Sequence, residues 1–190
     1  MRITCLMGSP RTKGNTALMA QRFLTTAEEM GAEVRTHVLN NLSYRGCQAC
    51  YACKTTSEVC VLDDDLSPVL EEIKEADLLV IASPVYFADV TSQVKAFIDR
   101  TFSYVKPDFQ TNPQPYRLAP GKKLLFIQAQ EAPEESYGDI FPRYEFFFKL
   151  GGFVETRLIR ATEVGPAGAV LERPEFLKEA EAAAREMCAG

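Results

Sequence analysis

Histidine is almost absent from this sequence, and His37 is the only one among 190 residues. Histidine is the side chain most often used as a general base near neutral pH, and it is a common metal ligand. Mechanisms that depend on a histidine base, a histidine pair or a mixed His/Cys metal site are therefore disfavoured, because only one histidine is present. Much of hydrolase chemistry is disfavoured for this chain.

The chain also lacks a basic cluster and any long apolar run. Lysine and arginine total 21 against 26 aspartates and glutamates, which gives a net charge of −5, and the basic residues are scattered. No electrostatic footprint for nucleic acid or for an anionic membrane surface is visible. The N-terminal segment reaches Gly8 before a signal-peptide core could be completed, and no apolar stretch approaches membrane-spanning length. We expect a cytoplasmic protein without nucleic-acid or membrane partners.

The length and composition of the chain are typical of one globular domain of ordinary size. The composition, with 46% hydrophobic and 25% charged residues, is close to the globular average. No linker, internal repeat or low-complexity run divides the chain. We therefore expect a single domain over residues 1–190.

Short apolar runs alternate with longer segments of helical periodicity, a pattern typical of parallel strands joined by crossover helices. Strands are expected at residues 2–7, 33–39, 77–83, 122–128 and 153–161. Helices are expected at residues 15–30, 65–75, 91–102, 135–149 and 174–187. The predicted fold is a three-layer α/β domain with a doubly wound, five-stranded parallel sheet of order 2-1-3-4-5. Residues 46–62 and 107–120 do not follow this alternation of strand and helix patterns, and they are expected to be long functional loops.

The turn after the first predicted strand has the composition of a phosphate site. Residues 8–16 read GSPRTKGNT, and an apolar-periodic helix follows at once. Glycines let the backbone approach an anion, short polar side chains donate hydrogen bonds, and the free N–H groups of a helix start favour negative charge. Two basic residues in the loop fit a dianionic monoester better than a neutral ligand. The candidate ligands of the phosphate are Ser9, Arg11, Lys13, Gly14, Asn15 and Thr16.

The phosphate interpretation has a simpler alternative, because Asn15 or Thr16 could merely cap the following helix. The two roles are compatible. The spacing of the loop matches neither the Walker loop nor the dinucleotide-binding pattern.

A second candidate loop follows the third predicted strand. This strand is apolar throughout and is expected to be central, and it ends in Ser83 followed by the run PVYF. The carboxyl ends of strands one and three flank the switch point of such a sheet, so the two loops should face one site. A proline stiffens the loop, and an aromatic side chain offers a surface to a flat ring. The residues predicted to hold a flavin ring are Pro84, Val85, Tyr86 and Phe87.

Four of the six cysteines crowd into the segment 46–62, in the pattern C-x2-C-x2-C-x6-C. This spacing suits metal or redox chemistry in a reducing compartment better than a disulfide framework. Four thiolates in one loop are enough for a [4Fe–4S] cluster, whereas structural zinc more often uses two separated pairs. Cysteines without metal, structural or redox-active, are a further alternative. The candidate ligands are Cys47, Cys50, Cys53 and Cys60.

Charged residues near these motifs have simpler interpretations. The run Asp63-Asp64-Asp65 could bind a divalent cation, but capping of the next helix by Asp64 or Asp65 is the better prediction. Asp99 and Arg100, at the end of a predicted helix, are expected to give structural support rather than to take part in catalysis.

Four motifs together resemble the flavodoxin-like NAD(P)H-dependent FMN reductase superfamily, and within it the iron–sulfur flavoprotein branch. They are GSPR with GNT in residues 8–16, the cysteine stretch ending in Asp63-Asp64, SPVYF in 83–87, and KAFIDR in 95–100. The resemblance implies an FMN whose phosphate lies at Ser9, Arg11, Asn15 and Thr16, and whose ring lies along residues 84–87. It also implies homodimers or homotetramers. Relatives often carry a glycine-rich third loop where residues 128–133 here read QAQEAP.

The leading functional hypothesis is an FMN-dependent oxidoreductase. NAD(P)H or a protein donor would reduce the flavin. The flavin would pass the electrons, with or without a [4Fe–4S] cluster, to a quinone, a flavin, a nitro compound or a ferredoxin-like protein. Because the cofactor carries the chemistry, no catalytic side chain is predicted. The alternatives are a non-enzymatic flavodoxin-like electron carrier or redox sensor and, more distantly, a zinc-stabilised interaction module.

Overall fold

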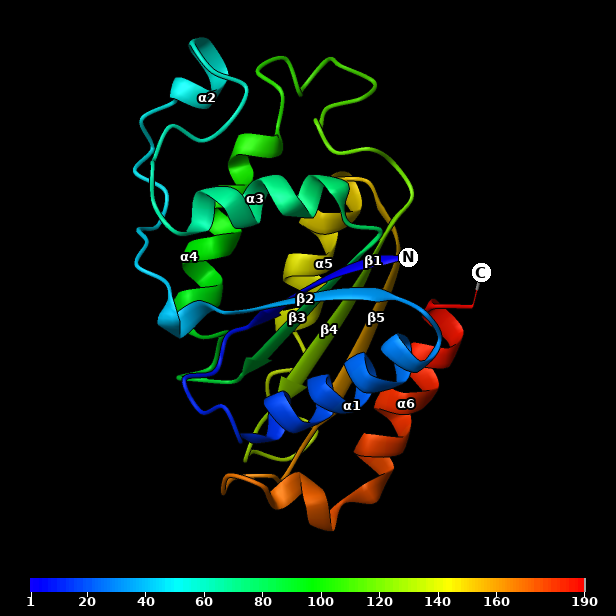
Figure 1. The fold of residues 1–190 in the computed structure, drawn as a ribbon. Helices are drawn as coiled ribbons and strands as arrows, with labels where there is room; N and C mark the ends of the chain where they lie inside the picture. The colour runs from blue at the N-terminus through cyan, green and yellow to red at the C-terminus, as the bar shows by residue number, and fades with distance from the viewer. Residues whose placement is uncertain (190) are drawn as a thin grey trace.

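A parallel sheet of five strands forms the centre of the computed structural model, which describes residues 1–189 (Figure 1). The strands are β1 (Arg2–Met7), β2 (Glu33–Val38), β3 (Leu78–Pro84), β4 (Lys122–Ala129) and β5 (Phe153–Ala161). Their order is β2-β1-β3-β4-β5, and every neighbouring pair is parallel. The predicted strands and sheet order are confirmed, with small shifts at the strand ends.

Helices cover both faces of the sheet, as the three-layer prediction requires. They are α1 (Asn15–Glu29), α2 (Ala52–Thr55), α3 (Leu66–Glu75), α4 (Ser92–Arg100), α5 (Ile140–Leu150) and α6 (Pro174–Met187), with short 3-10 turns η1 (Leu39–Asn41), η2 (Thr101–Tyr104) and η3 (Ala169–Glu172). One apolar core lies between the sheet and α1 with α6, and the other lies between the sheet and α3, α4 and α5. Strand β3 is buried along nearly its whole length, as expected for a central parallel strand.

Two helix predictions differ from the structure, and one short helix was not predicted. The helix predicted at 135–149 begins only at Ile140, because Pro142 has no N–H and is tolerated only in the first turn of a helix. The helix predicted at 91–102 ends at Arg100 and continues as the 3-10 turn η2. The short helix α2, inside the cysteine-rich segment, was not predicted. Within residues 1–189, every helix is too short or too polar to cross a membrane.

Candidate functional site

The loop between β1 and α1 is tied to the neighbouring strand and helix by hydrogen bonds. The backbone N–H of Gly8 donates to the carbonyl of Ala82 at 2.8 Å, and the hydroxyl of Thr91 donates to the carbonyl of Gly8 at 2.9 Å. Farther along, the N–H of Arg11 donates to Ser9 Oγ at 3.0 Å. The loop therefore has a defined shape at the carboxyl ends of β1 and β3, where α/β sheets bind ligands.

Gly8 is required here by close packing. A Cβ at this position would lie 2.2 Å from Val94 Cγ2 and 3.1 Å from the carbonyl oxygen of Ala82, both of them buried residues. We expect Gly8→Ala to lower the free energy of unfolding by about 2 kcal/mol, measured by urea denaturation. Gly46→Ala is the matched control, because the nearest atom to its Cβ would be Ala96 Cβ at 3.7 Å. Equal losses in the two variants would contradict the packing argument.

The two predicted ligand loops converge on one cavity of about 240 Å³. It is lined by Ser9, Arg11, Gly14, Asn15 and Thr16, by Pro84, Val85 and Tyr86, and by residues of two further loops: Ala129, Gln130, Glu131, Val164, Gly165 and Ala167. Lys13 is exposed and does not line this cavity. Phe87 is fully exposed and lines an adjacent cavity of about 380 Å³, which shares Val85, Gln130 and Glu131 with the first. The arrangement offers a polar pocket beside an open edge that carries the aromatic ring of Phe87.

The loops after β4 and β5 were not assigned ligand roles from the sequence. The side chain of Gln130 is buried and donates to the carbonyls of Pro133 and Ser136, both at 2.9 Å, which shapes the first loop. Glu131 packs so closely on Gly165 that a Cβ there would lie 2.7 Å from its Cδ. The only sequence signal for this wall of the cavity was that residues 128–133 differ from the glycine-rich loop of the resembled family. Residues 164–167 gave no signal.

The side chain of Asn15 does not have the geometry of a phosphate ligand. Its Nδ2 donates to the carbonyls of Val164 at 2.8 Å and Pro166 at 3.0 Å, and its Oδ1 accepts from the N–H of Val170 at 3.1 Å. These three bonds occupy the amide with backbone groups. Asn15 thus joins the start of α1 to the loop after β5, and the backbone at the start of α1 remains the part that can face an anion.

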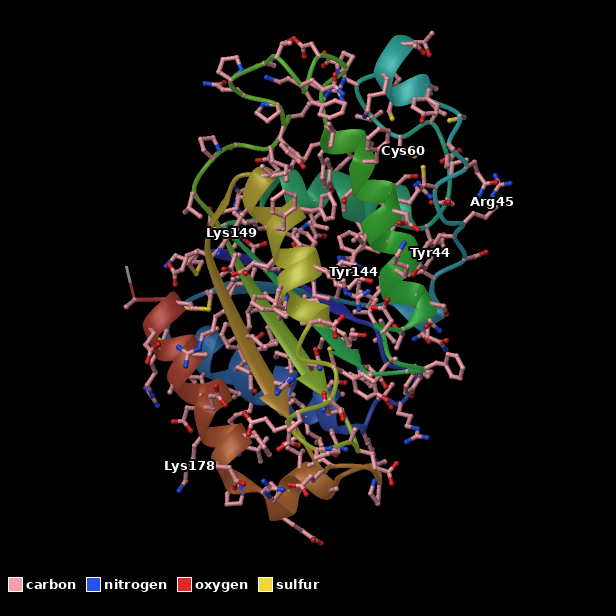
Figure 2. All side chains as sticks on the ribbon, turned by 180° about the vertical axis from the view of Figure 1, so that it is seen from behind. Tyr44, Arg45, Cys60, Tyr144, Lys149 and Lys178 are labelled. Atoms are coloured by element: carbon pink, nitrogen blue, oxygen red, sulfur yellow. The ribbon has the colours of Figure 1, made fainter. Side chains whose placement is uncertain are left out.

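The cysteine-rich segment lies at the other end of the domain. In Figure 1, α2 stands at the top, whereas the arrows of β3 and β4 point toward the lower part of the molecule. The chain reaches α2 by running along α4, where the hydroxyl of Tyr44 donates to the carbonyl of Gln93 at 2.7 Å. Figure 2 shows Tyr44, Arg45 and Cys60 beside this helix. The cysteines and the cavity near Ser9 are therefore separate sites within one chain.

All four candidate cysteines line one small cavity of about 20 Å³, together with Arg100, Phe102 and Ser103. Cys47 and Cys50 are exposed, and Cys53 and Cys60 are half-buried. In the part of the chain that the structure describes, no three Cys, His, Asp or Glu side chains are arranged as ligands of one metal ion. The set fits a cluster in donor type and in shared location, but the sulfur atoms are not gathered at coordinating distances.

Two cations lie beside these cysteines. Lys54 Nζ is 3.4 Å from Cys53 Sγ and donates to the carbonyls of Phe102 at 2.6 Å and Val105 at 2.7 Å. Burial lowers the pKa of Lys54. Arg117 Nη2 donates to the carbonyl of Cys53 at 3.2 Å. Both side chains attach the cysteine segment to η2 and its neighbourhood, and both place positive charge near the sulfur atoms.

A family model described as NADPH-dependent FMN reductase matches residues 1–132. An iron–sulfur flavoprotein from Methanosarcina thermophila is 35% identical over 109 residues, which cover 57% of this chain and 56% of the relative. The chain thus spans about half the length of the curated relatives that it matches.

Two solved structures share the fold over almost the whole chain. One is an NAD(P)H:quinone oxidoreductase from Methanothermobacter marburgensis, with a TM-score of 0.78, 18% identity, and coverage of 98% of this chain and 96% of that one. The other is an FMN-dependent NADH-azoreductase from Bacillus anthracis in complex with FMN, with a TM-score of 0.76, 16% identity, and coverage of 99% and 100%. At these identities the likeness shows the fold alone.

Proposed function

Because the chain belongs to the NADPH-dependent FMN reductase family, we propose that it is an FMN-dependent oxidoreductase. NAD(P)H or a protein donor supplies the electrons, and a quinone, flavin, nitro compound or protein accepts them. The observation that carries the proposal is the convergence of the loop at residues 8–16 and the loop at 84–86 on one cavity. That cavity lies at the switch point of a doubly wound sheet.

The chain's residues fit the two ends of FMN. Ser9, in the loop after β1, and Thr16, in the first turn of α1, are buried polar side chains, and Arg11 brings a positive charge to the same cavity. With the free N–H groups of the helix start, they would hold a phosphate dianion. Pro84 and Tyr86 line the neighbouring part of the cavity and would hold the flavin ring, with Phe87 at its open edge.

FMN supplies hydride and single-electron transfer when it is bound. The protein contributes orientation and the local field. Glu131 lines both cavities, so its carboxylate disfavours further negative charge in the space that the ring would occupy. Gln130, through its bonds to the following loop, holds that wall in place.

For the cysteines we propose a [4Fe–4S] cluster bound by Cys47, Cys50, Cys53 and Cys60. Four thiols in one segment and the named iron–sulfur relatives support this assignment. Lys54, Arg117 and the loop around α2 would position the ligands. Because this segment and the FMN cavity lie at opposite ends of the domain, a homodimer or homotetramer is proposed as the working form, in which the two sites of different copies can approach.

The first experiment is anaerobic purification followed by a visible spectrum with iron, sulfide and FMN content per chain. We expect flavin bands, broad cluster absorbance and about four irons. Flavin without iron or sulfide would refute the cluster and leave a simple FMN reductase. A colourless protein that takes up no FMN would refute the proposed function.

A steady-state assay then separates the enzyme from an electron carrier. NAD(P)H consumption is measured with a quinone, free flavin or nitro compound as acceptor. We expect turnover. Reversible single-electron titration of the flavin without turnover would instead support the carrier or redox sensor.

A further inference from the structure

Arg100 ends α4, and its side chain is fully buried. Its guanidinium forms a two-pronged ion pair with Asp64, with Nη1 at 2.7 Å from Oδ2 and Nη2 at 3.2 Å from Oδ1. Such a fork restrains both distance and orientation. Asp64 in turn accepts from the N–H of Leu66, the first residue of α3, at 3.2 Å. Asp65 caps nothing with its side chain and instead accepts from the N–H of Ser43.

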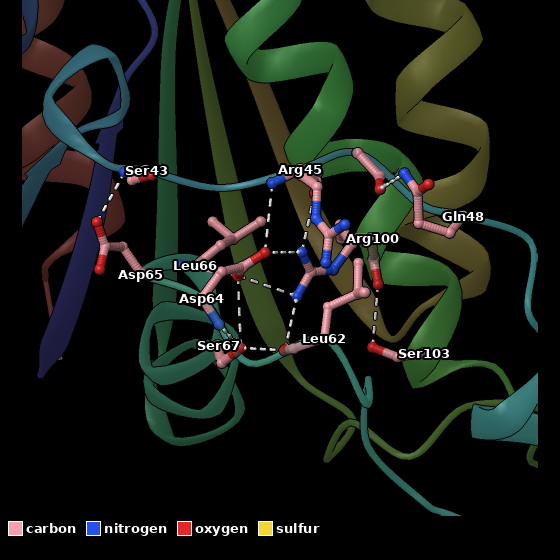
Figure 3. A network of polar contacts seen from close by, with 11 residues as sticks. Ser43, Arg45, Gln48, Leu62, Asp64, Asp65, Leu66, Ser67, Arg100 and Ser103 are labelled. Carbon is pink, nitrogen blue, oxygen red and sulfur yellow. Dashed lines mark hydrogen bonds and ion pairs between the residues drawn. The ribbon is translucent and has the colours of Figure 1, made fainter.

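The same guanidinium holds both ends of the cysteine-rich segment (Figure 3). Nη1 donates to the carbonyl of Arg45 at 2.8 Å, two residues before Cys47, and Nη2 donates to the carbonyl of Leu62 at 3.4 Å, two residues after Cys60. The N–H of Arg45 also donates to Asp64. The two stems that flank the cysteines are therefore joined through one buried side chain.

One donor of Arg100 is left over. Among residues 1–189, Nε is buried and has no hydrogen-bond partner. A buried donor without an acceptor is costly, and in a native protein it calls for an explanation. Arg100 lines the small cavity that is also lined by the four cysteines. Sulfur atoms carrying negative charge in that cavity would be suitable acceptors.

The charges around Arg100 agree with this geometry. Burial alone would lower the pKa of Arg100, but Asp64 and Cys60 hold it above its ordinary value. Burial alone would raise the pKa of Asp64, but hydrogen bonds from Arg100 and Arg45 hold it below its ordinary value. Both members of the pair are thus charged at neutral pH.

We propose that Arg100 is a positioning residue of the cysteine site. Its terminal nitrogens hold the two stems, and its free Nε donates to cysteine sulfur when the four cysteines bind the cluster. The second part rests on the proposed [4Fe–4S] function. The first part concerns the protein alone, so the two can fail separately.

The test compares Arg100→Met/Asp64→Asn with the wild type. Both charges are removed together, because losing one partner of a buried pair leaves an uncompensated charge and endangers folding. Asparagine retains an acceptor for the N–H of Leu66. Arg100→Lys keeps the charge without the fork. Lys95→Met is the matched control, because it removes a positive charge from an exposed pair on the same helix.

In the iron-loaded protein, we expect the double variant to lose iron to a chelator about tenfold faster than the wild type. Its remaining cluster should have a lower reduction potential, because the hydrogen bond from Nε to sulfur, which favours the reduced and more negative form, is lost. For Arg100→Lys, the rate of iron release and the reduction potential should lie between those of the double variant and those of the wild type. For Lys95→Met, both should match the wild type. Unchanged iron release and potential in the double variant would overturn the proposal.

The protein without iron gives an independent readout. Chymotrypsin cleavage after Tyr51, which is exposed, reports on opening of the segment. We expect cleavage at least about fivefold faster in the double variant, since losing about 1 kcal/mol of restraint favours local opening by that factor. If the wild type binds no iron, the cluster is refuted, and the cleavage rate alone tests the positioning role of Arg100. Faster cleavage in the double variant then supports that role, and an unchanged rate overturns it.

Discussion

Ser9→Asp is expected to weaken FMN binding by about 100-fold or more, while riboflavin binding changes only a few-fold. Ser9 is buried in the cavity at the start of α1 and accepts a hydrogen bond from the N–H of Arg11. Aspartate can accept the same bond, so the loop keeps its shape. Two like charges about 4 Å apart at a protein surface repel by about 4 kcal/mol. A 100-fold loss corresponds to about 2.8 kcal/mol, or about two-thirds of that repulsion. Quenching of flavin fluorescence on titration measures both affinities.

Ser9→Asn is the matched control for this prediction. It has nearly the size and shape of aspartate and the same acceptor for Arg11, but it carries no charge. We expect its FMN affinity to stay within about tenfold of the wild type. If the aspartate and asparagine variants bind FMN equally well, the phosphate does not lie at this loop. If riboflavin loses as much affinity as FMN, the effect comes from the loop structure and not from phosphate charge.

Asn15→Ala is expected to lower the free energy of unfolding by about 3 kcal/mol. Its side chain satisfies two carbonyls and one N–H of the loop after β5, at distances of 2.8 to 3.1 Å, and it is buried. Removing the amide leaves those backbone groups without partners, and each such group costs about 1–3 kcal/mol. Urea denaturation followed by circular dichroism measures the loss.

Asn40→Ala is the control for Asn15→Ala. Asn40 is exposed and accepts one hydrogen bond, from Gln93 at 3.0 Å. Its loss should cost about 0.5 kcal/mol or less. A similarly small effect for Asn15→Ala would mean that water replaces its three bonds, and that the loop after β5 does not depend on this residue.

The sheet could be predicted because each strand is a local pattern. The apolar runs, such as residues 78–82 in the buried β3, need no information from elsewhere in the chain. The same holds for the loop at residues 8–16, whose glycines, hydroxyls and basic residues stand together in the sequence. The start of α5 was predicted too early because the helical periodicity begins before Ile140, whereas Pro142 can stand only in the first turn of the helix.

The remaining walls of the cavity could not be predicted, because they depend on contacts between distant residues. Asn15 looked like a phosphate ligand or a helix cap, yet its partners lie 149 to 155 residues away. Arg100 was expected to give structural support, but its contacts with the stems at Arg45 and Leu62 follow only from the course of the chain along α4.

The sequence by itself determined the order of the parallel sheet and the two loops that meet at its switch point, because strand periodicity and right-handed crossovers leave few arrangements. It also determined which residue types are available as ligands. The tertiary structure alone decided that the cysteines and the cavity near Ser9 lie at opposite ends of the domain. It alone selected the partners of Asn15 and Arg100, because a buried polar side chain pairs with whichever backbone groups the fold brings to it.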